Sequence, residues 1–142
     1  MIDEARNLMS AVASAMNRDL HINNFDDRLY LQKGCYILNS WGFKPNFRYN
    51  MYIHGPYSRE LADTYYTAGD ITTKDTNIPA ERITELGNIL NKSRSYAEAY
   101  ATLLMVKNNN PNDSNEKIYK VALNLKPHLK KEMEEAASCL LS

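Results

Sequence analysis

Residues 47–61 constrain the fold more than any other stretch, because the apolar period changes there from that of a strand to that of a helix. Apolar and polar side chains alternate from Phe47 to Ile53, as in a half-buried strand. The alternation stops before Gly55-Pro56, where glycine permits unusual backbone angles and proline fixes φ. Ser58 then has the position of a helix N-cap. We therefore predict a strand over 47–53, a rigid turn at Gly55-Pro56 and a helix after Ser58.

A second strand is predicted at Ile71-Thr72-Thr73, where β-favouring residues follow a helix that we expect to end at Gly69. We expect this segment to pair with the first strand. Two strands alone are marginally stable in water, so the β-ribbon must pack against helices.

Helical periods and capping residues predict about seven helices, which occupy most of the chain. They are residues 3–17 with Asp3 as the N-cap, Asn24 or Asp26 to about Ser40, a helix capped by Ser58, one opened by Asn77-Ile78-Pro79, one capped by Ser93, one begun by Asp113 at capping-box spacing from Glu116, and one near Pro127. The predicted fold class is mainly α with a small β-ribbon after the second helix, a layout that resembles winged-helix folds.

The second helix is expected to be the centre of the fold, because its apolar residues occupy more than one side. Gly34 in its interior indicates that another backbone packs closely there. Gln32 and Lys33 are polar residues in this apolar setting, so they must find partners or reach the surface. We predict that both contact the turn around residues 54–56, with a solvated Lys33 as the alternative.

Composition places the chain among small globular proteins. Its 142 residues suit one domain, residues 1–142, and its 17 basic and 17 acidic residues give no net charge that would attract DNA or an anionic membrane. No apolar run approaches the roughly 20 residues that cross a bilayer, and the start lacks the features of a secretory signal. Cys35 and Cys139 are far apart and without zinc-ligand spacing, so we expect free thiols in the cytoplasm.

Few residues suggest catalysis. His54 lies near Glu60 in sequence and could act as a general base, but the preferred interpretation is that it hydrogen-bonds the turn. Cys35 falls on an apolar helical stripe and is interpreted as a core thiol. His21 and His128 have no ligand partner at helical spacing, and no phosphate-binding or nucleophile-elbow motif occurs. We therefore predict no enzyme, no catalytic residue, no metal and no cofactor.

Nucleic-acid binding is the alternative function. Basic residues cluster around the second helix and the ribbon, interleaved with tyrosines that could stack on bases: Arg28, Lys33, Lys44, Arg48 and Arg59, with Tyr30, Tyr36, Tyr49, Tyr52 and Tyr57. Acidic residues in the same region and the neutral total count against this hypothesis.

Ten tyrosines make a protein interface the leading hypothesis, because tyrosine combines a large apolar area with a polar tip. Helical spacing assigns Tyr36, Tyr65, Tyr96 and Tyr100 to the core. The predicted interface set is Tyr49, Tyr52, Tyr57 and Tyr66.

Two segments resemble a known family: Leu31-Gln32-Lys33-Gly34-Cys35-Tyr36, and residues 52–61 with their aromatic-x-x-Gly-Pro turn. This pair resembles the signature of Panacea antitoxin domains and the related YwgA-like uncharacterised proteins. Tyr57-Ser58 after Gly-Pro and Gly34-Cys35 in the helix favour the YwgA-like branch. The resemblance implies a mainly helical fold with a β-ribbon, no cofactor, and binding to another protein.

The predicted function is therefore a non-enzymatic interaction module, antitoxin-like or an adaptor, whose partner is a protein such as a toxin. Self-association stays open. The predicted partner-binding residues are Gln32, Lys33, Tyr49, Tyr52, His54, Gly55, Pro56, Tyr57 and Arg59.

Overall fold

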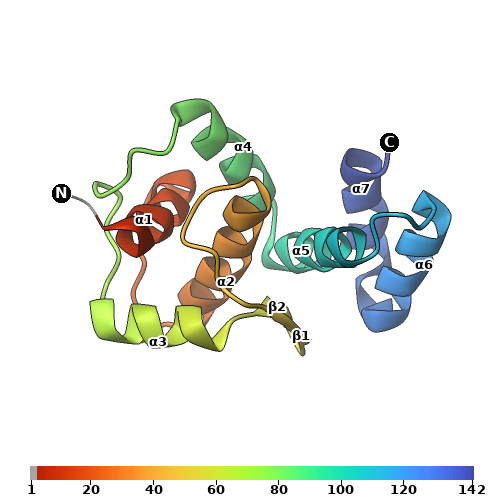
Figure 1. Ribbon diagram of the computed structural model, residues 1–142, viewed down its shortest axis with the longest axis horizontal. Coiled ribbons are helices and arrows are strands. Elements are labelled where there is room, and N and C mark those ends of the chain that lie inside the picture. Colours follow the sequence, from red (N-terminus) through yellow and green to blue (C-terminus); the bar gives the residue numbers. More distant parts are fainter. Residues whose placement is uncertain (1–2) are drawn as a thin grey trace.

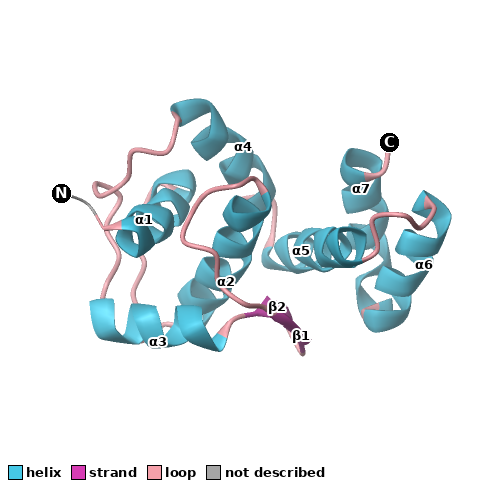
Figure 2. Cartoon of the chain, in the orientation of Figure 1, coloured by secondary structure: helices cyan, strands magenta, loops and turns pink. Residues whose placement is uncertain are grey.

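The computed structural model describes residues 3–142 and confirms the predicted fold class. Seven α-helices, one short 3-10 helix and two strands occur in the described residues, joined by loops (Figures 1 and 2). In chain order they are α1 (Glu4–Met16), α2 (Phe25–Ser40), β1 (Asn50–Tyr52), β2 (Gly55–Tyr57), α3 (Arg59–Ala68), α4 (Ala80–Leu90), α5 (Arg94–Asn109), α6 (Asn115–Leu125), η1 (Pro127–Leu129) and α7 (Lys130–Leu140).

Helix α2 lies at the centre, as predicted. It contacts α1, α3, α4, α5 and β2, and every residue from Leu31 to Leu38 is buried. Figure 1 shows α1, α3 and α4 grouped around α2, with α5 leading from this group to α6 and α7. A Cβ on Gly34 would lie 2.7 Å from Val12 Cγ2, so the predicted close approach is real. The neighbour, however, is a side chain of α1 and not the backbone that the sequence suggested.

The β-ribbon is a tight hairpin, and the predicted position of its turn was wrong. Strands β1 and β2 are antiparallel, with Tyr52 opposite Gly55. The turn is Ile53-His54, so Gly55-Pro56 lies in the second strand. The only non-glycine residue with a positive φ among residues 3–142 is Asn17, so both turn residues have negative φ, and Gly55 at φ 93° follows them. A turn of this kind followed by a positive-φ glycine is a known hairpin solution.

The alternating segment before β1 is tied to α2 instead of to a second strand. The Asn39 amide nitrogen donates to Phe43 O and to Pro45 O, both at 2.8 Å. Its oxygen accepts from Phe47 N at 3.3 Å and from the Tyr49 hydroxyl at 2.9 Å. The predicted strand over 47–53 therefore shortens to Asn50–Tyr52.

The second predicted strand, residues 71–73, was also wrong. Ile71 pairs with Leu20 in an isolated antiparallel bridge, through Leu20 N to Ile71 O at 2.8 Å and Ile71 N to Leu20 O at 2.9 Å. Both side chains are fully buried. The segment after α3 is thus hydrogen-bonded to the loop between α1 and α2, and not to β1.

Most predicted helix starts are confirmed by side-chain caps. Asp3, Asn24, Ser58 and Ser93 each accept a backbone hydrogen bond at the start of a helix. Among the predicted capping residues Asp113 is the exception, because Ser114 accepts from Lys117 N at 3.2 Å, and α4 begins after Pro79 without a side-chain cap. Across the described part of the chain, no helix combines the length and hydrophobicity that a membrane span requires.

Candidate partner-binding site

The hairpin is fastened to α2 by the two polar residues that the sequence singled out. Gln32 is buried; its Nε2 donates to Ser58 O at 2.9 Å and its Oε1 accepts from Ser58 N at 2.7 Å. Lys33 Nζ donates to Pro56 O at 2.9 Å. The predicted contact of Lys33 is therefore confirmed, while Gln32 binds two residues beyond the predicted turn. The solvated alternative for Lys33 is wrong, because the residue is only 3% exposed.

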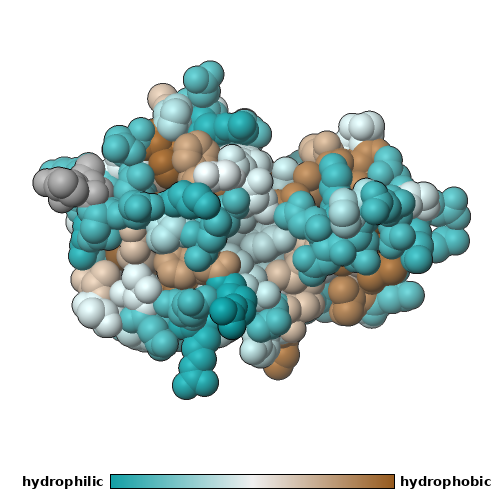
Figure 3. All heavy atoms as spheres, in the orientation of Figure 1, coloured by the Kyte–Doolittle hydropathy of each residue, from teal (hydrophilic) through white to brown (hydrophobic). Residues whose placement is uncertain are grey.

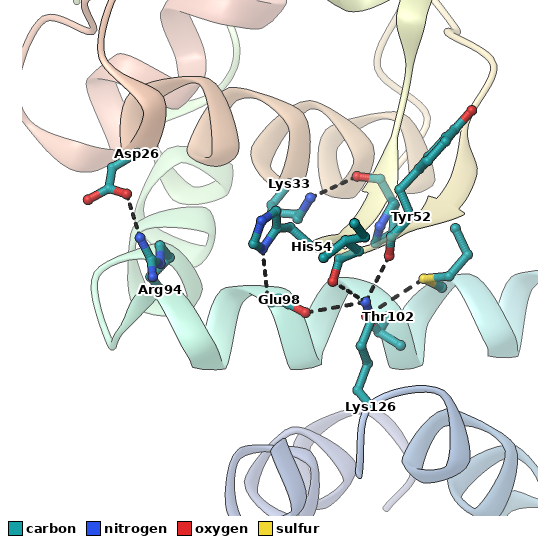
Figure 4. A network of polar contacts seen from close by, with 11 residues as sticks. Asp26, Lys33, Tyr52, His54, Arg94, Glu98, Thr102 and Lys126 are labelled. Atoms are coloured by element: carbon teal, nitrogen blue, oxygen red, sulfur yellow. Dashed lines mark hydrogen bonds and ion pairs between the residues drawn. The ribbon is translucent and has the colours of Figure 1, made fainter. Parts of the chain in front are cut away.

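Two further residues, Glu98 and Lys126, complete the attachment on the other side of the hairpin (Figure 4). Lys126, between α6 and η1, is 5% exposed and donates through Nζ to Tyr52 O at 2.8 Å and to Ile53 O. Glu98 Oε2 on α5 lies 3.5 Å from the same nitrogen, as an ion pair. The sequence analysis missed both residues. A usable signal was that Glu98 is the only charged residue between Arg94 and Lys107.

The buried charges in this cluster are unequal. The ammonium groups of Lys33 and Lys126 lie near one carboxylate, that of Glu98. Burial lowers the pKa of Lys33 to about 7; Glu98 opposes that change and Lys126 adds to it. When Lys33 is protonated, two ammonium groups face one carboxylate, so the cluster has a surplus of positive charge, and burying an ammonium without a full counter-charge is costly.

His54 lies at the open edge of the cluster. Its Nδ1 is 3.9 Å from Glu98 Oε1, and its ring meets the edge of Phe25 at 5.5 Å between centroids. Glu60, the expected carboxylate neighbour, accepts from Arg48 N instead. The hollow between His54, Glu98 and Lys33 measures only about 10 Å³. A space of that size holds one water at most, so a substrate has no room between these groups.

An apolar groove lies next to the cluster, between the first half of α2 and the hairpin. Phe25, Leu29, Tyr52, Ile53 and Tyr57 line a hollow of about 230 Å³. Ile53 is 81% exposed, Tyr52 56% and Phe25 50%. Figure 3 shows hydrophobic atoms gathered at the lower edge of the molecule, over the hairpin. The groove is smaller than the roughly 300–1,000 Å³ pockets that enclose small molecules, but its rim is strongly apolar.

An adjoining hollow of about 240 Å³ extends the groove toward α3. It shares Phe25, Leu29 and Tyr57 with the groove and adds Arg28 and Tyr66, the latter 60% exposed. We call the two hollows together the hairpin groove, which is formed by Phe25, Arg28, Leu29, Gln32, Lys33, Tyr52, Ile53, His54, Gly55, Tyr57, Tyr65 and Tyr66.

The nine predicted site residues fall into three groups. Tyr52, His54 and Tyr57 line the groove with exposed or half-buried side chains, and the Tyr52 and Tyr57 rings meet at 5.3 Å. Gln32, Lys33, Gly55 and Pro56 are buried and hold the hairpin. Tyr49 is half-buried, with its ring 4.9 Å from that of Tyr36, and Arg59 is exposed on α3; neither lines the groove.

Two larger hollows lie on other faces, of about 600 Å³ beside α1 and α3 and about 510 Å³ beside α1 and α4. Their linings are mainly short polar residues and helix-surface residues, without the exposed aromatic rim of the hairpin groove. Within residues 3–142, no group of three or more His, Cys, Asp or Glu side chains is placed to hold a metal ion.

No family model, curated protein or solved structure matches this chain. The resemblance to Panacea antitoxin domains therefore stays a prediction from the two sequence segments.

Proposed function

We propose that the protein is a non-enzymatic interaction module, antitoxin-like or an adaptor, that binds another protein through the hairpin groove. The observation that carries this proposal is the rigid presentation of Ile53, which is 81% exposed at the tip of a hairpin whose backbone is held by Lys33 and Lys126. Ile53 shares its hollow with the exposed Tyr52 and Phe25, and a contiguous exposed apolar patch, unlike a single exposed side chain, indicates a binding site.

The support is energetic as well as geometric. Ordering a flexible loop on binding costs free energy, whereas a hairpin that is already fixed avoids that cost. The aromatic rim offers large contact areas with few rotatable bonds, which suits an interface. The 10 Å³ hollow beside His54 and Glu98 argues against a reaction at the same place.

The nucleic-acid alternative has weaker support, because part of the predicted cluster is buried, although Lys44, Arg48 and Arg59 are exposed. Lys33 is 3% exposed and donates to Pro56 O at 2.9 Å, so it is not open to a phosphate. Tyr36, one of the proposed stacking residues, is 8% exposed. An alternative of this kind predicts binding that weakens steeply as salt rises.

The test is site-specific photo-crosslinking in cells that produce the protein. A benzoylphenylalanine at position 53 should form an adduct with one protein, which mass spectrometry identifies and which then binds the full chain after purification. The matched control is position 88, because Asn88 is exposed on α4, away from the hairpin. Equal adducts at both positions, or no protein adduct at position 53, would contradict the proposal.

A further inference from the structure

Among residues 3–142, basic side chains line the hairpin groove and carboxylates do not. Arg28, Lys33 and His54 contribute to its lining, and no Asp or Glu among the described residues does. The nearest acidic residues of α2 are engaged elsewhere: Asp26 pairs with Arg94, and Asp27 pairs with Arg18 at 2.9 Å. The groove thus combines an apolar rim with basic side chains. The nearest carboxylate to His54, that of Glu98 at 3.9 Å, lies in the small hollow behind the groove and not in its lining.

Phe25 links two of these groups. The Arg28 guanidinium carbon lies 5.6 Å from the centre of its ring, and the His54 ring meets it at 5.5 Å. Both side chains are therefore held at the exposed ring that forms the groove wall. Only one Arg28 nitrogen is bonded to Ile22 O, so the guanidinium keeps donors for a ligand.

The buried end of the groove also has a shortage of negative charge. Lys33 lines the groove and shares a single carboxylate, that of Glu98, with Lys126. An acidic ligand group at the mouth of the groove would reduce this imbalance, whereas a basic group would increase it.

We propose that the hairpin groove binds a short segment of a partner protein in which large apolar side chains are accompanied by carboxylates that face Arg28 and His54. This inference rests on the proposed function and adds the chemistry of the partner. The two hollows, of about 230 and 240 Å³, receive the apolar side chains of the segment. The carboxylates supply the charge that the groove lacks and give direction to a contact that is otherwise apolar.

The experiment is a selection from a random 12-residue peptide library displayed on phage, with the immobilised full chain as the target. Enriched peptides are synthesised, and their Kd values are measured by fluorescence polarisation. We expect sequences with net negative charge and at least two large apolar residues. Ile53→Asp should weaken them at least about tenfold, from lost apolar contact and added repulsion. Arg28→Gln and His54→Gln should each weaken them about fivefold.

Two controls keep the result specific. Arg59→Gln removes an exposed cation that does not line the groove, so the Kd should stay within about twofold of the wild-type value. Circular dichroism of every variant checks that the helices persist. Sedimentation velocity of the chain alone checks self-association.

The outcomes separate this inference from the proposed function. Neutral or basic peptides that still depend on Ile53 would overturn the acidic chemistry and leave the proposed function standing. A selection without Ile53-dependent peptides would overturn the inference, while crosslinking at position 53 still decides the proposed function. A dimer that Ile53→Asp abolishes would identify a second copy of the chain as the occupant, which also contradicts the inference.

Discussion

Replacing Lys33 with methionine should make the protein more stable at low pH and should nearly lose this advantage at high pH. Methionine keeps the length of the side chain and removes the buried ammonium. Burial lowers the pKa of Lys33 from 10.5 to about 7, which corresponds to about 5 kcal/mol against the folded protein when the group is fully charged. The lost hydrogen bond to Pro56 O offsets about 1–3 kcal/mol of this gain.

The pH dependence follows from the sign of the pKa change. Between pH of about 7 and 10.5 the unfolded chain keeps a proton that folded Lys33 has released, so the stability of the wild-type protein rises with pH. Of the about 5 kcal/mol by which buried, charged Lys33 destabilises the folded protein, about 3 kcal/mol is lost between about pH 6 and pH 9. Lys33→Met should therefore exceed the wild type by about 2–4 kcal/mol at about pH 6, and the two should be nearly equal at about pH 9.

Urea denaturation followed by circular dichroism at both pH values measures this difference. With a slope of about 2 kcal/mol per molar urea, the midpoint difference between the two proteins should change by about 1.5 M. Lys44→Met, at an exposed lysine, is the control and should follow the pH dependence of the wild type. The reasoning is refuted if the difference between Lys33→Met and the wild type is the same at both pH values.

Three further predictions concern the residues around the hairpin and the two thiols. Gln32→Leu should lower the free energy of unfolding by about 2–4 kcal/mol in urea titrations, because it leaves a buried backbone donor and acceptor without partners; an effect below about 0.5 kcal/mol would contradict this role. Gly55→Ala should lower Tm more than Gly42→Ala, since both glycines have positive φ but only Gly55 has neighbours, the nearest at 3.2 Å from an added Cβ; equal losses would show that packing is unimportant there. Cys139 is exposed, whereas Cys35 is buried and burial raises the pKa of its thiol. A disulfide reagent should therefore modify Cys139 in the native protein and Cys35 only in denaturant. Rapid modification of both thiols in the native protein would contradict this prediction.

Local signals predicted most of the helices. Side chains such as Ser58 and Ser93 form hydrogen bonds with backbone only three residues away, so their role can be read within one helical turn. The contact of Lys33 with the hairpin was also predictable, because a polar side chain in an apolar helix must find a partner. The prediction reached the segment of residues 54–56, whereas the particular acceptor, Pro56 O, comes from the structure.

Long-range pairings were not predictable in this way. The alternation over residues 47–53 indicated a strand. The Asn39 side-chain amide, however, hydrogen-bonds the backbone of residues 43, 45 and 47, so Phe47 N is not free to pair with a second strand. Lys126 donates to Tyr52 O, which is 74 residues away in the sequence. No hydrophobic periodicity or sequence motif predicts such a contact. The groove forms only when these pairings bring α2 and the hairpin together. Tyr52 and Tyr57 were predicted from their residue type, whereas Phe25 and Ile53, which line the same groove, were not predicted.

Affinity for the crosslinked partner, measured by isothermal titration calorimetry with full-length protein, tests the central claim most directly. Burying the exposed Ile53 side chain is worth about 2 kcal/mol, so Ile53→Asp should raise Kd by about 30-fold or more. Val121→Asp changes another exposed apolar residue, on α6, and should leave Kd within about twofold. Equal affinities for the wild-type protein and Ile53→Asp, with both folded, would contradict a partner-binding role for the hairpin groove.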